Sequence, residues 1–420
     1  MPDQPQAPGP IVLKFPVGLD NRSRETALPE GALREAVNVD VTREGTLLAR
    51  KGLRLLTAGD FHSFYSPPHD RFALVVKDGN LCRWDGSNFT TLRAANGSRR
   101  MSYASLNSEV FFSDGLIQGR VTAAGVLDYW GLATPPSPTC GALSIGGLTA
   151  GTIRVTLTAL SGHLESGAPE PVALTLAEGG GVVVAVPTGA TFRVYVTDVD
   201  GDIFRAAADV ASGGSVQIGV GYRGKPLDSL GAVRPYPGQY VTAYKGRLWI
   251  ASGSTVWFTD TLSPHWLVPN EGYFSFESPI TMLGAAEDGL FVGTADRVYF
   301  LQGTKPADMN MRPTMHIGAI PGSGLNDMPM DVLLGQGSFP TRCCSFMDTD
   351  GVFCIGRPGG IVQRITEDRY VAGNARQADL SYGQHDGLRQ FLVLLDDESG
   401  DANAAIDVAV ATINDHGTVL

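Results

Sequence analysis

The sequence predicts an all-β fold made of many short strands, and three observations support this. Glycine and proline are abundant, with 52 and 26 residues in a chain of 420, and both residues disfavour helix interiors. Short apolar runs alternate with polar turns along most of the chain, as in antiparallel sheets. One sequence motif recurs along the chain; it consists of a strand, a turn that contains glycine and a second strand. These features predict a β-propeller-like domain with an inserted small β-sandwich of the immunoglobulin or fibronectin kind.

The N-terminal region precedes the repeated motif. Residues 1–10 are rich in proline and are expected to form a flexible tail, without the basic start and apolar core of a signal peptide. A short strand is predicted at residues 11–15. Residues 29–37 are the one helix expected here, because Pro29 and Glu30 suit a helix start. Two strands around a turn at Gly45 follow in residues 38–55.

Five copies of the repeated motif are the predicted propeller blades. They cover residues 72–84, 101–130, 240–260, 280–301 and 343–365. Each strand pair turns at a glycine, which tolerates positive φ. Gly246 and Gly289 lie about 43 residues apart, close to the roughly 40–50 of a propeller blade. An antiparallel sheet without radial closure is the alternative to a propeller.

Residues 135–221 interrupt the blades. They begin at a proline-rich linker and contain five to seven short β-branched strands, which predicts a β-sandwich inserted between two parts of the propeller, residues 11–134 and 222–420. Within the second part, residues 303–340 have little strand pattern and are expected to form an irregular loop that contacts neighbours. Two final strands, residues 388–395 and 405–413, are expected to pair with residues 11–15.

The charge balance is acidic, with a formal net charge of −11. Gripping phosphates requires an excess of Lys and Arg, so an acidic chain is a poor candidate for tight nucleic-acid binding. The negative charge suits a surface along which DNA moves without being bound, although a need for solubility alone explains the charge equally well. Arg99 and Arg100 form the one basic turn where we predict a contact with DNA.

The sequence contains no motif for catalysis, a cofactor or a metal. There is no nucleophile elbow and no phosphate-binding loop. The seven histidines lack metal-ligand spacing, and the five cysteines are an odd number without a C-x-x-C pair, which indicates neither a disulfide framework nor a zinc site. Cys343, Cys344 and Cys354 lie in an apolar strand pattern and are expected to be buried free thiols. Residues 198–202 resemble the start of a calcium loop, but later ligand positions fall on Phe204 and Ala206, so a hairpin turn is favoured. No stretch approaches about 18 uninterrupted apolar residues, so no transmembrane helix is expected.

Motifs spread over nearly the whole chain resemble one known family. They are Gly18–Arg22, Leu28–Asp40 and Gly45–Gly52 near the N-terminus, Phe192–Phe204 in the insert, and Gly246–Trp249, Asp288–Thr294 and Tyr299–Pro306 in the later blades. In this order they resemble phage tail nozzle proteins, also called packaged-DNA stabilisation or tail tubular proteins of short-tailed phages. Each motif consists mostly of glycine, proline and aromatic scaffold residues, so their order carries the resemblance.

The resemblance implies a structural virion protein and not an enzyme. Such a subunit would form a hexameric ring with itself, contact portal, adaptor and other tail proteins, and surround the channel that retains and conducts the viral DNA during ejection. Viral DNA would pass through the lumen without sequence-specific binding. The protein would bind no membrane, be assembled in the host cytoplasm and reside in the tail of the virion. The chain is short for this group, which leaves its level in the tail open.

Two alternatives remain at the sequence level, a glycan-hydrolysing and a receptor-binding tail propeller. Residues 251–257 lack the aspartate of sialidase-type propeller turns, and the acidic pairs at 287–288 and 396–397 fall on turns where water would solvate them. A receptor-binding protein would show an exposed aromatic cluster at one tip. Trp257, His265 and Trp266 lie near a loop, but Trp257 also suits a blade core.

Overall fold

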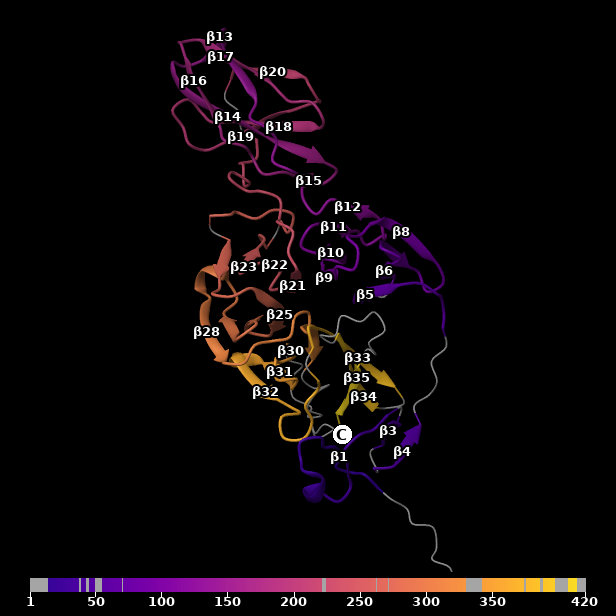
Figure 1. Ribbon diagram of the computed structural model, residues 1–420. Coiled ribbons are helices and arrows are strands. Elements are labelled where there is room, and N and C mark those ends of the chain that lie inside the picture. Colours follow the sequence, from indigo (N-terminus) through magenta and orange to yellow (C-terminus); the bar gives the residue numbers. More distant parts are fainter. Residues whose placement is uncertain are drawn as a thin grey trace, which may run out of the picture. The chain divides into compact units, whose positions relative to one another are not determined.

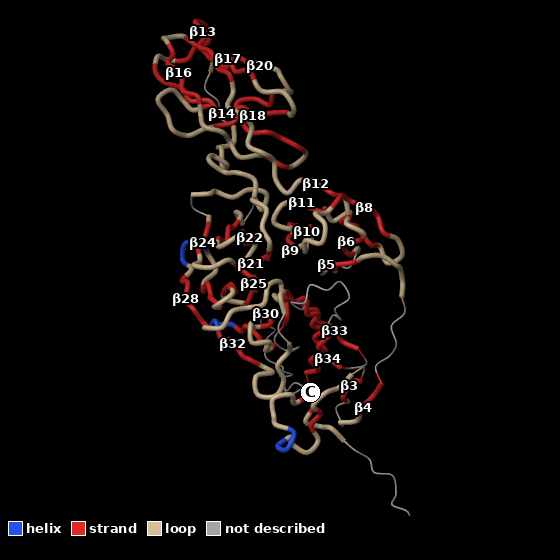
Figure 2. Tube along the Cα trace, in the orientation of Figure 1, coloured by secondary structure: helices blue, strands red, loops and turns tan. Residues whose placement is uncertain are grey.

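The computed structural model describes residues 14–37, 39–42, 45–49, 55–69, 71–220, 224–261, 263–270, 272–329, 342–373, 375–385, 388–396 and 407–413. Two compact units make up the chain: residues 59–276, and residues 1–58 together with 277–420. Strands dominate the described residues, and the helices among them are three 3-10 turns: Glu25–Ala27, Pro306–Asp308 and Pro358–Gly360 (Figure 2). The prediction of an all-β fold is confirmed.

The unit of residues 59–276 contains three four-stranded antiparallel sheets with consecutive strands side by side (Figure 1). The first has β5 (Phe61–Tyr65), β6 (Ala73–Lys77), β7 (Asn80–Trp84) and β8 (Phe89–Ala94); the second β9 (Ser102–Leu106), β10 (Glu109–Ser113), β11 (Gln118–Val121) and β12 (Leu127–Asp128); the third β21 (Tyr240–Tyr244), β22 (Arg247–Ser252), β23 (Thr255–Phe258) and β24 (Tyr273–Ser275). A four-stranded meander of this kind is the blade of a propeller.

The tight turns of these blades have a local cause. Asp78 and Gly79, with φ of 49° and 71°, connect β6 to β7, and Lys77 pairs with Asn80 across the turn. Lys245 and Gly246 connect β21 to β22 in the same way, with φ of 47° and 75°. Two consecutive residues of positive φ form the hairpin turn whose twist matches that of the flanking strands. The sequence therefore sets the register of these two hairpins at their turns.

The three sheets pack through alternate residues of β10. Val110 and Phe112 join a core with Leu74 and Leu81 of the first sheet, whereas Phe111 joins Ile250 and other residues of the third. Because neighbouring side chains of a strand point to opposite faces, one strand contributes to two cores. Burial of each large apolar side chain contributes about 1.5–3 kcal/mol. The stacked sheets confirm the propeller-like prediction for this unit.

The insert between β12 and β21 is a β-sandwich, as predicted (Figure 1). One sheet contains β13 (Thr139–Leu148), β17 (Gly180–Ala185) and β20 (Ser215–Ile218); the other contains β14 (Gly151–Ser161), β15 (Leu164–Glu165), β16 (Val172–Leu176), β18 (Thr191–Val196) and β19 (Arg205–Val210). Alternate residues Ile153, Val155 and Leu157 of β14 share one core with Val182 and Val184 of β17. Because alternate residues of a strand point to the same face, the inward-facing residues of the two sheets form a core between them.

The second unit holds two further four-stranded blades and a three-stranded sheet. The blades contain β25 (Ile280–Ala286), β26 (Gly289–Thr294), β27 (Val298–Gln302) and β28 (Asn310–Met315), and then β29 (Leu325–Pro329), β30 (Arg342–Met347), β31 (Phe353–Arg357) and β32 (Ile361–Arg364); the three-stranded sheet contains β33 (Gln377–His385), β34 (Leu388–Asp396) and β35 (Asp407–Ile413). Near the N-terminus, β1 (Gly18–Leu19) pairs in parallel with β2 (Ala32–Leu33), and β3 (Val39–Val41) pairs with β4 (Leu47–Ala49).

Packing in this unit places the adjacent cysteines of β30 in different cores. Cys344 joins Phe291 and Phe300 of the preceding blade, and Cys343 joins Phe391 of β34. Both thiols are fully buried and free. A Cβ on Gly284 would lie 2.6 Å from the Cys344 sulfur, so glycine is required where the two sheets approach. The expectation of buried free thiols is confirmed for this pair.

Three expectations for the connecting segments need correction. The helix over residues 29–37 is wrong: Gly31 has a φ of 81°, and β2 pairs with β1 in its place. The segment 303–340 is not one irregular loop, because it contributes β28 and β29; residues 330–341 lie outside the described part. The C-terminal hairpin of β34 and β35 pairs with β33, and not with residues 11–15 as expected. Phe15 is not part of a strand, and its N–H donates to the Gly45 carbonyl. Residues 1–13, which include the expected tail, lie outside the described part.

Candidate functional site

The predicted DNA contact at Arg99 and Arg100 lies on the turn between β8 and β9. Arg99 is exposed, and its Nε donates to the Asp114 carbonyl at 3.3 Å. Arg93 and Arg83 make similar bonds to the Gln118 and Gly125 carbonyls, at 3.3 and 3.4 Å. These three arginines, from the first blade and the turn that follows it, thus donate to backbone carbonyls of the second blade. Arg99 therefore has a structural role in joining the two blades. Contact of this turn with DNA stays a prediction.

The N-terminal motif Gly18–Arg22 fastens its segment to the loop after β32. The Asn21 amide donates to the Val371 carbonyl at 2.8 Å, and its oxygen accepts the Val371 N–H at 3.0 Å. Asp20 accepts the backbone N–H groups of Ser23 and Arg22 and the Ser23 hydroxyl. The bonds from Ser23 hold the pKa of the Asp20 carboxyl below its usual range, although burial opposes them. These motif residues therefore position the backbone.

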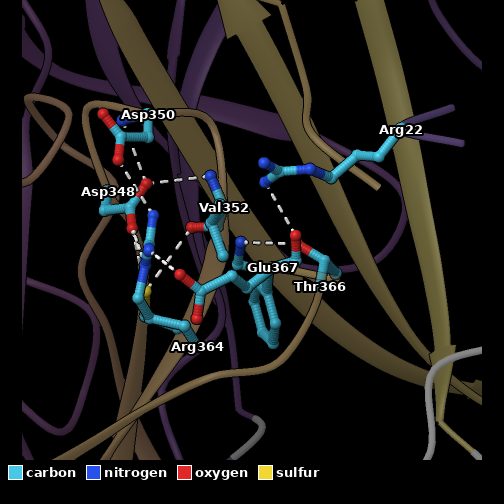
Figure 3. A network of polar contacts seen from close by, with 9 residues as sticks. Arg22, Asp348, Asp350, Val352, Arg364, Thr366 and Glu367 are labelled. Carbon is cyan, nitrogen blue, oxygen red and sulfur yellow. Dashed lines mark hydrogen bonds and ion pairs between the residues drawn. The ribbon is translucent and has the colours of Figure 1, made fainter. Parts of the chain in front are cut away.

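A polar network surrounds Arg364 beside this loop (Figure 3). Asp348 is fully buried; its Oδ1 accepts the N–H groups of Asp350 and Val352 at 3.0 and 2.9 Å. Its Oδ2 accepts Arg364 Nε at 2.8 Å, and Arg364 also bonds the Asp350 and Glu367 carboxylates. Every oxygen of Asp348 is thus engaged.

Two further contacts extend this network. Arg22 donates to the Glu367 carbonyl at 2.7 Å, which joins the N-terminal motif to it (Figure 3). The Cys354 thiol donates to Asp348 Oδ2 at 3.5 Å. Burial, and then the charge of Asp348, raises the pKa of this thiol well above its ordinary value. A protonated, buried thiol is a poor nucleophile, so Cys354 packs in this blade turn as a structural group.

A second buried carboxylate lies in the sandwich. Glu165 accepts the hydroxyls of Thr158 and Tyr195 at 2.7 and 2.6 Å, and Lys225 donates to it at 2.7 Å. Burial alone would raise the pKa of Glu165, but these three bonds hold it below its ordinary value. A glycosidase acid needs the opposite shift. Glu165 is therefore an ion-paired structural group.

Two acidic residues of the calcium-loop-like segment also have partners within the chain. In the turn at 198–202, Asp200 accepts the Thr152 N–H at 2.8 Å and Asp202 pairs with Arg154 at 2.8 Å. The favoured hairpin turn fits these contacts. Among the described residues, no group of three or more His, Cys, Asp or Glu side chains is arranged to hold a metal ion.

Sequence reasoning missed a charged cluster around Arg120 of β11. The Arg120 side chain is 3% exposed and bonds Glu109 at 3.0 Å and Asp128 at 2.5 Å. Its Nη1 also lies 3.0 Å from Nε2 of His163, in the turn between β14 and β15. Burial, and then Arg120 and His163, lowers the pKa of nearby His265 to about 4. No sequence signal links these residues, which come from three separate segments.

The low pKa of His265 predicts acid lability of this unit. An unfolded histidine titrates near 6.5, so the stabilisation is complete above about pH 6.5 and is lost as the pH falls towards about 4. We expect a loss of roughly 1 kcal/mol between pH 7 and pH 4.5, because the ring is partly solvent-exposed. Urea unfolding at both pH values measures it. His265→Gln should flatten this dependence, and an unchanged slope would contradict the assignment.

An aromatic cluster lies on the third blade. Trp257 of β23 contacts Tyr236 and Tyr273, with ring centroids 5.0 and 5.2 Å apart. The tyrosines are 37% and 48% exposed, and Trp257 is partly buried. The rings of His265 and Trp266 contact each other in a tilted arrangement, with centroids 4.8 Å apart. Trp257 thus both packs against the blade core and contributes to an exposed aromatic surface.

Comparisons with known proteins add little to this geometry. No family model and no curated protein matches the chain. Similar solved structures include BBS1N in complex with ARL6DN, at 10% identity over 83% of this chain and 93% of that chain, with a TM-score of 0.33. Hsv2 of Kluyveromyces lactis matches at 8% identity over 80% and 90%, with a TM-score of 0.30. Scores this low carry no argument, and the fold rests on the sheets described above. Within the described residues, no helix is long and apolar enough to cross a membrane.

Proposed function

We propose that the chain is a non-catalytic structural protein of a phage tail. It forms a ring, by resemblance a hexamer, as a nozzle or head-to-tail connector subunit with portal, adaptor and other tail proteins as neighbours. The ring surrounds the DNA channel and helps to retain and conduct the packaged genome. The protein resides in the virion tail and requires no cofactor.

The observation that carries this proposal is the order of scaffold motifs along an all-β chain. The N-terminal motif occupies the segment fastened by Asn21, and the later motifs fall on β22 and β26. The acidic net charge of −11 supports a surface along which DNA slides, because carboxylates repel phosphates. In the described part of the chain, hydrogen bonds and nearby cations lower the pKa of six carboxyl groups, which supports a non-catalytic role because a catalytic acid needs a raised pKa. The six groups are Asp20, Asp78, Asp85, Glu165, Asp209 and Asp296.

Electron microscopy of the intact particle tests the proposal. With an antibody against the chain as the marker, we expect density on the tail axis in a closed ring of subunits. The wall of the channel should be acidic or neutral, apart from the turn at Arg99 and Arg100. A position away from the axis, or a channel lined with arginine, would overturn the proposal.

A receptor-binding role in the tail is the second candidate, and the aromatic cluster of Tyr236, Trp257 and Tyr273 favours it. Partly exposed rings of this kind stack on sugars or on partner side chains. Binding of the chain to host surface glycans tests this role. Tyr273→Ala should then weaken binding about tenfold, whereas Tyr129→Ala, at a tyrosine 69% exposed, should not. Absence of binding by the wild-type chain removes this candidate.

A further inference from the structure

The first blade has an aromatic face opposite the one that packs on the second blade. Leu74 of β6 joins the core shared with the second blade. Its neighbour Ala73 is paired with Trp84, and Trp84 is paired with Phe89. Neighbouring side chains of a strand point to opposite faces, and paired residues share a face. The rings of Trp84 and Phe89 therefore lie on the face away from the second blade.

Four rings form a continuous row on this face, which we call the aromatic row. The ring centroids of Phe61 and Phe89 are 5.5 Å apart, those of Phe89 and Trp84 are 6.3 Å apart, and those of Trp84 and Phe64 are 6.3 Å apart. Phe61 and Phe64 are 38% and 60% exposed. Exposed apolar surface of this kind loses the free energy that its burial would supply, and a contiguous patch marks a place where a partner binds.

A bulge in β5 places the fourth ring in the row. Residues three apart in a regular strand point to opposite faces, so Phe61 and Phe64 would not share one. Ser63 has a φ of 54°, and the pairing of β5 with β6 shifts at this point. The Ser63 hydroxyl accepts the Met101 N–H at 2.9 Å, which helps to hold this backbone conformation. Strained residues of this kind are concentrated at functional sites.

The rim of the aromatic row is negatively charged. Asp60 directly precedes β5 and Asp85 directly follows β7, and both are exposed. Hydrogen bonds from backbone N–H groups of its turn hold the pKa of the Asp85 carboxyl below its usual range. Lys77 is paired with Asp78 at 2.5 Å and so does not neutralise the other carboxylates. A negative rim repels phosphates and favours a partner that is apolar at its centre and positively charged around it.

The chain itself contains a segment of this chemistry near its N-terminus. Leu48 of β4 is 54% exposed, and Leu55 and Leu56 are 78% and 72% exposed. The sequence from residue 47 to residue 56 contains three basic residues and no acidic one. Its leucines match the aromatic row, and its positive charge matches the negative rim.

We propose that the aromatic row binds the leucine segment, Leu47–Ala49 with Leu55 and Leu56, of a second copy of this chain. Two different surfaces that fit each other make a head-to-tail contact between subunits, and contacts of this kind close into rings. The inference rests on the proposed function for its choice of a second copy, and it deepens that function by naming the two surfaces that join the subunits.

Photo-crosslinking of the purified full chain tests this contact. With benzoylphenylalanine in place of Phe64, we expect a product of twice the chain mass in which the probe is joined to a peptide from residues 47–56. The same probe in place of Tyr129, a residue 69% exposed on the second blade, is the control and should give no such product. A probe at Phe64 that reacts only within its own chain, or with another part of the second copy, would overturn the proposal.

Sedimentation of matched variants measures the contribution of each surface. Phe64→Ser and Leu48→Ser should each weaken self-association about tenfold, because each removes an apolar group from the contact. The double variant should lose little more, since the two side chains meet each other. Leu116→Ser, at a leucine 62% exposed on the second blade, should associate like the wild type.

The outcomes separate this contact from the proposed function. Equal association of Phe64→Ser and the wild type would refute the contact, with far-ultraviolet circular dichroism as the check that each variant is folded. A ring found away from the tail axis by electron microscopy would refute the tail function. The crosslink between the aromatic row and the leucine segment would still stand in that case.

Discussion

Asp348→Ala is expected to destabilise the unit of residues 1–58 and 277–420 by about 3–5 kcal/mol. The substitution removes a fully buried carboxylate that accepts two backbone N–H groups and pairs with Arg364 at 2.8 Å. Arg364, whose side chain is 18% exposed, would keep its bonds to Glu367 and Asp350 but would lose its one buried carboxylate partner. Breaking a buried pair by removing one member costs this much because the other charge stays buried.

Urea unfolding followed by far-ultraviolet circular dichroism measures this loss. Asp350→Ala is the matched control, because Asp350 pairs with the same Arg364 at 3.0 Å but is 57% exposed. An exposed pair contributes about 0–1 kcal/mol, so the control should barely change stability. Equal effects of the two substitutions would contradict the buried-network explanation. The Asp348→Asn variant should fall between them, since the amide oxygen can still accept N–H groups but carries no charge.

The blades could be predicted from the sequence because their signals are local. The turn residues Asp78 and Gly79 and the apolar strands on either side set a hairpin within a dozen residues. The same holds for Lys245 and Gly246. The inserted sandwich was also predictable, since β14 alternates apolar and polar residues and a proline-rich linker precedes the insert.

Outer strands and distant contacts could not be predicted in this way. In β28 the residues Asn310 to Pro313 are exposed, so the strand lacks the apolar alternation that identifies a buried one. The helix expected at residues 29–37 failed because backbone bonds to Val17 and Asp20 fix Gly31 and Leu33 in an extended segment. A local helix pattern cannot report such partners.

The candidate sites depend even more on distant contacts. Arg22 and Glu367 lie 345 residues apart in sequence, and Arg120 and His163 lie 43 apart. Neither pair leaves a spacing that a motif search would recognise. The aromatic cluster could be predicted in part: the sequence singles out Trp257, but the contact of Trp257 with Tyr273 depends on the pairing of β23 with β24. That register is set by packing, not by a turn signal.

Trp249→Ala is expected to destabilise the unit of residues 59–276 by about 3–5 kcal/mol. Trp249 of β22 is completely buried and packs against three rings, with centroid distances of 5.1 Å to Phe258, 6.1 Å to Phe274 and 6.3 Å to Tyr244. Its indole N–H donates to the Tyr244 carbonyl at 3.3 Å. Alanine would lose the burial of a large ring and leave a cavity that β22, which is hydrogen-bonded to β21 on one edge and to β23 on the other, cannot close.

Chemical denaturation of the full chain, followed by far-ultraviolet circular dichroism, gives the size of this loss. Tyr129→Ala is the control, because Tyr129 is an aromatic residue of the same unit but is 69% exposed; it should change stability by less than about 0.5 kcal/mol. Trp249→Phe should lose less than the alanine variant, since a ring still fills part of the space between Phe258 and Phe274. A Trp249→Ala variant as stable as the Tyr129→Ala control would mean that the rings of this blade do not hold it together, and the packing described for β22 would have to be abandoned.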